Sequence, residues 1–307
     1  MKSKLLEINN FKVKSDLNEI LDIILAEITK NIRPSDRMIS FYNFVGRFPR
    51  ALGIPLLLLT SVDAWKVVIL AGIFNRTDAA LQTIYNHKVR PWRLFWAIGD
   101  ALWQGAYNCR SVRARALFVK ELVPLLIFEI QNLVNFSRRP IVASIGSGSA
   151  IQLFQSLFNN SLNKSCHLIL VDRDHRALKR GRKNASFFDI ESADFQKTTI
   201  GSFLKRSPES SIDLIEMVGL TDYFENRHLE RYFKKINHVL SPSGFFIGAN
   251  ISNNEESDYA HGVVCWPHMF YRSNLEIIDL LKSSGFKKIW TGECGLYTFW
   301  IAQKSSL

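Results

Sequence analysis

Beyond residue 140, short apolar runs alternate with stretches of helical character, and this rhythm constrains the fold more than any other feature of the sequence. The runs are 141–145, 167–171, 187–190, 212–216 and 244–249. Strands that alternate with helices form βαβ units, whose parallel sheet is buried on both faces. Two later runs, 287–290 and 296–302, predict an antiparallel pair at one edge. We therefore predict an α/β fold built on a mostly parallel sheet.

The first 136 residues have a different character, because their apolar residues follow helical spacing. Ile20, Ile23, Ile24 and Ile28 recur at intervals of three and four and predict one apolar stripe. Further helices are expected from Ser35 or Asp36, over 89–105 and over 111–136. The rhythm changes at 137–140. We predict a helical N-terminal domain, 1–136, that serves as lid, substrate or oligomerisation domain, and an α/β domain, 137–307.

Composition narrows the class of protein. Apolar residues make up 47% of the chain and charged residues 22%, which is typical of a globular protein. The net charge of +11 lies mostly in the first 140 residues and would suit an anionic partner. Bases and acids are interleaved there, however, which argues against nucleic acid. Four cysteines without a CxxC pair and seven histidines without ligand spacing predict no metal site.

The location of the protein is also constrained by sequence. We see no secretory signal, so a cytoplasmic protein is expected. The most apolar stretch, 51–74, is interrupted by Pro55, Asp63 and Lys66, which favours a buried or peripheral helix over a membrane span. The sequence leaves open whether the protein binds at the membrane surface.

A glycine-containing turn follows the first predicted strand. Its sequence is Gly146-Ser147-Gly148-Ser149-Ala150. Glycines allow positive φ angles, and the next helix offers free N–H groups to a carboxylate or a phosphate. Ile151 stands where dinucleotide-binding proteins carry a third glycine, so a nucleoside that bears an amino acid suits the turn better. The glycines could also do no more than form a turn.

Acids follow the next strands. Asp172 closes the second run, where a carboxylate can accept hydrogen bonds from both ribose hydroxyls. It could instead cap the helix that follows. Asp194 and Phe195 come after the third run, where they would offer an acceptor for an exocyclic amine and an aromatic face for stacking.

These segments, together with Asp213-Leu214-Ile215-Glu216, make residues 140–304 resemble the class I S-adenosylmethionine-dependent methyltransferases. The resemblance implies a Rossmann-like seven-stranded sheet and S-adenosylmethionine as cofactor. Ala150 replaces the family's last glycine, and Gln152 stands where many relatives carry an acid. The residues that it implies at the cofactor are Gly146, Ser147, Gly148, Asp172, Arg173, Asp194, Phe195, Glu216, Met217 and Val218.

A second resemblance concerns the acceptor. Residues 218–224 and 266–272 are similar to a bacterial methyltransferase group that includes enzymes implicated in making methyl esters of long-chain hydroxy fatty acids. Arg272 could grip a carboxylate through two hydrogen bonds, with a hydrogen bond from Tyr223. For an amine or a hydroxyl, His268 could act as a base. Tyr271, like Tyr223, could donate or accept a hydrogen bond, and Trp266 could wall the pocket. The competing interpretations are that the aromatic residues pack at the sheet edge and that His268 is a surface loop residue.

Aromatic and basic residues also mix in the helical half. Phe41, Tyr42 and Arg47 could face the substrate as part of a lid, or belong to an amphipathic helix packed on its neighbours. Trp92 and Trp96 allow the same two interpretations.

We expect an enzyme that transfers a methyl group by in-line displacement to a small apolar acid, alcohol or amine, or to a lipid-like substrate. An RNA methyltransferase, transfer of the cofactor's aminocarboxypropyl arm, and a non-catalytic scaffold stay open as alternatives. So does a homodimer.

Overall fold

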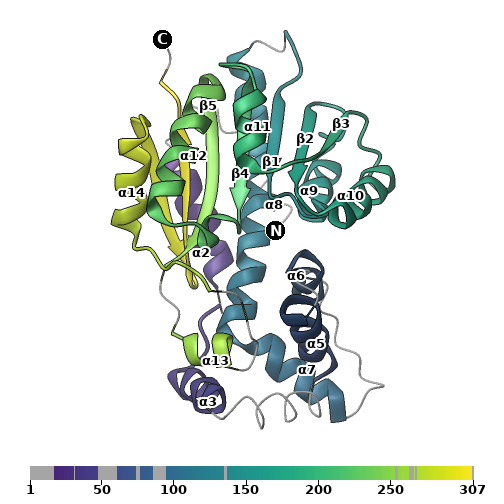
Figure 1. Cartoon of the computed structure of the whole chain (residues 1–307), viewed down its shortest axis with the longest axis vertical. Coiled ribbons are helices and arrows are strands. Elements are labelled where there is room, and N and C mark those ends of the chain that lie inside the picture. The colour runs from purple at the N-terminus through teal and green to yellow at the C-terminus, as the bar shows by residue number, and fades with distance from the viewer. Residues whose placement is uncertain are drawn as a thin grey trace.

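A seven-stranded sheet forms the centre of the molecule in the computed structural model (Figure 1). The described residues are 17–30, 32–47, 61–73, 77–85, 95–134, 137–252, 255–262, 266 and 268–305. The strands are β1 (Ile141–Ile145), β2 (His167–Asp172), β3 (Ala193–Lys197), β4 (Ile212–Val218), β5 (Leu240–Ile251), β6 (Lys288–Cys294) and β7 (Tyr297–Gln303). Their order is β3-β2-β1-β4-β5-β7-β6, with β7 antiparallel to both of its neighbours. The predicted sheet, with its antiparallel pair at one edge, is confirmed.

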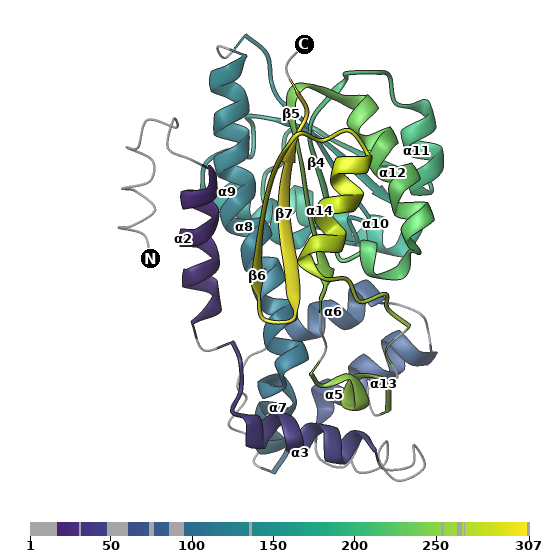
Figure 2. The same ribbon diagram turned by 90° about the vertical axis from the view of Figure 1, so that its left-hand side faces the viewer.

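The helices of the α/β half cover both faces of this sheet. They are α9 (Ile151–Asn159), α10 (His175–Phe187), α11 (Ile200–Arg206), α12 (Asn226–Val239) and α14 (Asn274–Ser283). A further short helix, α13 (Ser257–Gly262), lies away from the sheet and packs against the N-terminal half. Successive strand residues point to opposite faces, so Val142 and Leu214 join one apolar cluster while Ala143 and Ile215 join the other. The sheet is therefore the middle of three layers, as Figure 2 shows.

The N-terminal half is helical, as predicted. Its helices are α2 (Leu17–Thr29), α3 (Asp36–Gly46), α5 (Val62–Val67), a π-helical turn (Val68–Ile73), α6 (Thr77–Tyr85), α7 (Phe95–Gly105) and α8 (Tyr107–Leu133). Ile20, Ile24 and Ile28 are buried, whereas Ile23 is 45% exposed on the outer face of α2. Among the described helices, none is both long and apolar enough to cross a membrane. Residues 51–60 of the apolar stretch lie outside the described residues.

The third strand is not where the sequence predicted it. Residues 187–190 begin at the last residue of α10, and β3 comes later, at Ala193–Lys197. Phe187 is 80% exposed and packs edge-on against Phe188, which in turn contacts Phe158 of α9. The apolar run 187–190 therefore packs at the ends of helices and does not form a strand. The sequence did not indicate β3 as a strand, because β3 lies at the edge of the sheet and contains no fully buried residue.

One apolar cluster draws on both halves of the chain. Leu122, Leu126 and Ile130 of α8 belong to the same cluster as Leu153 and Phe154 of α9. A further cluster, at the far end of the molecule, joins α3, α5, α6 and α7 to α13. The division into two domains stays a prediction, because the sheet and the helical half share a core.

Candidate active site

A cavity of about 640 Å³ opens at the carboxyl ends of β1, β2 and β4. β1 pairs with β2 on one side and β4 on the other, so the strand order reverses here, which is where open α/β sheets bind ligands. The predicted residues that line it are Gly146, Ser147, Gly148, Asp172, Arg173, Glu216, Val218 and Tyr223.

The glycine turn and Asp172 lie in direct contact. Gly146 and Gly148 have φ angles of +71° and +55°, which only glycine adopts without strain. The N–H of Gly148 donates to Asp172 Oδ2 at 2.9 Å, and the N–H of Asp174 donates to Oδ1 at 2.8 Å. Burial raises the pKa of Asp172, and the two backbone hydrogen bonds oppose that shift. Asp172 does not cap α10, because Asp174 does so by accepting from the N–H of Arg176.

Glu216 brings a second carboxylate to the cavity, and its side chain is buried. It accepts hydrogen bonds from the Ser144 hydroxyl and from the N–H of Val218, the latter at 3.0 Å. Burial raises the pKa of Glu216 despite these bonds. Met217, the residue between, points to the opposite face of β4 and is fully buried against α12. It is therefore outside the lining, in contrast to the expectation from sequence.

Asp194 and Phe195 lie away from the cavity. Asp194 sits at the amino end of β3, with its side chain 60% exposed and 3.2 Å from Nε2 of His167. Phe195 packs under Arg182, whose guanidinium carbon is 5.0 Å from the ring centre. Since β3 starts later than predicted, its carboxyl end brings a different segment, 198–200, to the cavity. The expected adenine contacts were thus assigned to the wrong end of the strand.

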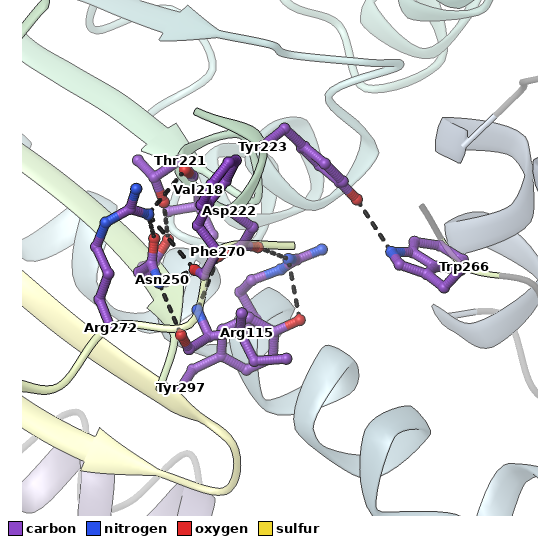
Figure 3. A network of polar contacts seen from close by, with 12 residues as sticks. Arg115, Val218, Thr221, Asp222, Tyr223, Asn250, Trp266, Phe270, Arg272 and Tyr297 are labelled. Carbon is purple, nitrogen blue, oxygen red and sulfur yellow. Dashed lines mark hydrogen bonds and ion pairs between the residues drawn. The ribbon is translucent and has the colours of Figure 1, made fainter. Parts of the chain in front are cut away.

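Arg272 serves the fold in this structure. It is only 2% exposed, and its guanidinium donates to Asn226 Oδ1 at 2.7 Å. It also donates to Asn250 Oδ1 at 2.9 Å (Figure 3). A further bond reaches the carbonyl of Thr221 at 3.3 Å. These contacts join β5 to the turn after β4. Arg272 is not in the lining formed by the described residues, so its geometry does not favour a grip on substrate.

The remaining residues proposed from 266–272 divide into two groups. His268 is exposed with its ring against Phe270, and Tyr271 contacts His261 at 2.9 Å. Both lie outside the described cavity lining. Trp266, by contrast, donates its indole N–H to the Tyr223 hydroxyl at 3.0 Å.

The proposed lid segment is also elsewhere. Tyr42 is buried and donates its hydroxyl to the carbonyl of Leu102, while Phe41 is half exposed. Arg47 pairs with Asp258 of α13 at 2.8 Å. Helix α3 thus packs on its neighbours, which was the competing interpretation. Trp92 and the side chain of Trp96 lie outside the described residues.

Helices α6 and α8 supply lining residues that the sequence analysis missed. Asp78, at the start of α6, pairs with Arg180 of α10, and Gln82 donates to the hydroxyl of Ser149 in the glycine turn. Asp78, Gln82 and Tyr85 follow one another at intervals of four and three residues and form one polar face of α6. This spacing could have been recognised in the sequence. These contacts place the helical half over the glycine turn.

A second cavity, of about 40 Å³, adjoins the first. The two share Leu81, Arg115 and Tyr223 as walls. Beyond these, the second cavity is lined mainly by apolar and aromatic side chains. They include Ile84, Trp103, Val112, Ile251, Tyr259, Trp266 and Met269. In the described part of the chain, no group of three or more His, Cys, Asp or Glu residues could hold a metal ion.

Residues 142–285 match the family model of a methyltransferase domain. The chain contains a class I methyltransferase domain. The predicted family, enzyme class and cofactor, S-adenosylmethionine, are thereby confirmed. The likeness to the group that makes fatty-acid methyl esters stays a prediction.

Solved structures with TM-scores above 0.5 share the fold of this methyltransferase. A protein of Bordetella parapertussis, described as a possible exported protein, covers 89% of this chain and 98% of its own, with a TM-score of 0.57 and 13% identity. The match to the CurJ carbon methyltransferase covers 80% of this chain and 67% of that protein, with a TM-score of 0.53 and 12% identity. An O-methyltransferase family protein from Burkholderia thailandensis covers 63% of this chain, with a TM-score of 0.46 and 18% identity, and the chain spans only 60% of its length. No curated protein sequence matches significantly.

The cavity of the methyltransferase fits its cofactor. The Ser147 hydroxyl is buried and has no hydrogen-bond partner among the described residues, so it can contact a polar ligand. A Cβ on Gly146 would lie 3.0 Å from Leu220, and one on Gly148 3.3 Å from Asp78, so a side chain at either position would press on its neighbour. Ser147, Gly148 and Asp172 are the residues that would hold the methionine and ribose parts.

Proposed function

We propose that this methyltransferase methylates a small acceptor with an apolar body, an acid, an alcohol or an amine, held in the part of the large cavity that meets the second cavity. The observation that carries the proposal is the position of that cavity. It meets the cofactor cavity at Tyr223 and Arg115, so an acceptor there would lie beside the cofactor.

S-adenosylmethionine supplies a methyl group that is already activated, so the protein has mainly to orient the acceptor and exclude water. Trp266 fixes the Tyr223 hydroxyl through its indole N–H, and Tyr223, which is half-buried, lines both cavities. Its phenol can orient a polar group of the acceptor. Burial raises the pKa of Tyr223 to about 12, so it stays a neutral donor near neutral pH.

Helix α6 supports a role for the helical half as the cover of the cofactor. Asp78 and Gln82 each contact the α/β half at the glycine turn or beside it. In this proposal the cover is α6, in place of the segment around Phe41.

The test separates cofactor binding from acceptor binding. We expect the wild type to bind S-adenosylhomocysteine in a calorimetric titration and to methylate members of a panel of small acids, alcohols and amines, with product masses that distinguish methyl from aminocarboxypropyl transfer. Val112→Phe, which places a ring in the second cavity, should abolish turnover and leave S-adenosylhomocysteine binding intact. Unchanged turnover in this variant would place the acceptor elsewhere. Failure of the wild type to bind S-adenosylhomocysteine at millimolar concentration would end the proposal.

A further inference from the structure

Helix α10 and the residues just before it present a strongly basic face to the outside. Residues 173–183 contain six arginines and lysines but one acid, Asp174. Five of the six cations are exposed, namely Arg173, Arg176, Lys179, Arg182 and Lys183. The inner face of α10 carries the buried residues Ala177, Leu178, Gly181 and Ala185. Figure 1 shows α10 at the right-hand margin of the molecule, beside the edge strand β3, so the cations face away from the fold.

These five cations have no acidic partner among the described residues. The acids near them are engaged elsewhere, because Asp78 pairs with Arg180 and Asp189 lies 3.2 Å from Lys164. Asp174 accepts from the backbone at the start of α10. Like charges three and four positions apart on a helix repel one another, so this row of cations costs stability. A face that keeps such a cost favours an anionic partner.

Exposed aromatic rings lie at the end of the row. Arg176, Lys179 and Lys183 follow one another at intervals of three and four, and Phe187 comes four positions later on the same face. Phe187 is 80% exposed, and Phe158 of α9 is 50% exposed. Both contact Phe188, with ring centres 4.9 and 5.8 Å apart. The three rings therefore form one apolar patch beside the cations, which we call the α9–α10 surface together with Arg176, Lys179 and Lys183.

The chemistry of this surface suits an anionic lipid membrane. Lysine and arginine are attracted to anionic headgroups, and phenylalanine enters the boundary between headgroups and acyl chains. Single-stranded RNA would instead need rings whose faces are free for bases to stack on. Phe187 and Phe188 pack edge to face, with an angle of 89° between their planes, and Phe188 also contacts Phe158. Rings that pack on one another suit a shared apolar boundary better than a series of bases.

We propose that the α9–α10 surface binds the anionic headgroups of a lipid membrane, with Phe158 and Phe187 at the acyl boundary. This inference goes beyond methyl transfer and does not depend on the acceptor. Arg173, the first cation of the basic segment, also lines the cofactor cavity, so the bound membrane would lie close to one side of that cavity.

The test is sedimentation of the full-length protein with phosphatidylcholine vesicles that contain about 30% phosphatidylserine, and with vesicles of phosphatidylcholine alone. We expect binding to the anionic vesicles only, and weaker binding as salt is added, because salt screens exposed charges. Each cation at the surface contributes about fivefold, so the triple variant Arg176→Gln/Lys179→Gln/Lys183→Gln should bind about 100-fold more weakly. Phe187→Ser, which removes an exposed ring, should lose about tenfold.

A matched control removes the same charge from the opposite edge of the sheet. Lys282 of α14, Lys287 and Lys288 of β6 are exposed and have no ion-pair partner among the described residues. The variant Lys282→Gln/Lys287→Gln/Lys288→Gln should bind anionic vesicles within about threefold of the wild type, because these cations lie far from the α9–α10 surface. Both triple variants should keep the thermal midpoint and the affinity for S-adenosylhomocysteine, since none of the six residues lines the cavity.

Several results would overturn the inference. One is a wild type that binds neither kind of vesicle, or both equally. Another is an equal loss in the control variant, because net charge alone would then explain the binding. Tighter binding of oligouridylate than of vesicles, lost in the α10 variant, would make the surface a site for RNA. Should the α10 variant unfold, Lys183→Gln and Phe187→Ser decide the matter singly, by losses of about fivefold and tenfold. None of these results bears on the proposed function, which has its own test.

Discussion

Replacing Asp172 with alanine tests the contact between the glycine turn and the second strand. In the structure this carboxylate accepts one hydrogen bond at each oxygen, from the N–H groups of Gly148 and Asp174, and the residue lines the cavity. If it also accepts from both ribose hydroxyls, the variant loses two hydrogen bonds to a charged group, each worth about 1.5 kcal/mol or more. The sum of about 3 kcal/mol corresponds to about 100-fold weaker binding of S-adenosylhomocysteine.

The same change affects the fold only modestly. Two backbone N–H groups lose an acceptor, but water in the cavity can replace it, so we expect a loss of about 1–2 kcal/mol in the free energy of unfolding. Asp174→Ala is the matched control, because this residue caps α10 two positions later. It should cost about 1 kcal/mol of stability and leave the affinity unchanged.

Calorimetric titration with S-adenosylhomocysteine and urea unfolding measure the two quantities separately. The reasoning is refuted if Asp172→Ala binds within about threefold of the wild type, since the carboxylate would then serve only the turn. It is also refuted if Asp174→Ala weakens binding equally, because the effect would then reflect the α10 terminus.

Further predictions concern residues on and off the cavity. Asp194→Ala should leave affinity for S-adenosylhomocysteine within about twofold and stability within about 0.5 kcal/mol, because its ion pair is exposed; a tenfold loss in titration would restore it as a cofactor contact. Gly219→Ala should cost about 1–2 kcal/mol in thermal unfolding, because φ is +85° and its Cβ would meet Arg115; an unchanged midpoint would contradict this. Burial opposes ionisation of Asp213, but the hydrogen bond from Arg138 and others outweigh it and lower its pKa. The stability that Asp213 provides is therefore complete above its unfolded pKa of about 3.9 and is lost as pH falls through the folded value. Urea unfolding from about pH 5 to pH 2 should show a smaller loss for Asp213→Asn than for the wild type, and parallel curves would contradict the assignment.

The sequence predicted those parts of the site in which local chemistry and strand burial coincide. Gly146 and Gly148 follow β1, a strand with four of its five residues buried, and Asp172 ends β2, so an apolar run marked the end of each strand. The third strand could not be recognised in this way. Because β3 lies at the edge of the sheet, it has no buried residue. The apolar Phe187 and Phe188 at the end of α10 were therefore taken for the strand.

The acceptor side could not be read from the sequence, because it depends on contacts between distant segments. Arg115 reaches the cavity from α8, 104 positions before Gly219 in the sequence, and no local pattern links the two. Arg272 lies in a motif-like segment, yet its partners are the asparagines that fold the turn. Which arginine faces a cavity is decided by packing of the helical half on the sheet.

The cluster that joins α8 to α9 also bears on attempts to isolate the catalytic part. A fragment that begins at residue 137 would lack the side chains of Leu122, Leu126 and Ile130, which cover one surface of the α/β half. Apolar area bared in this way costs about 25 cal/mol per Å² and favours aggregation. The methyltransferase is therefore not a transplantable module, and engineering it requires the whole polypeptide.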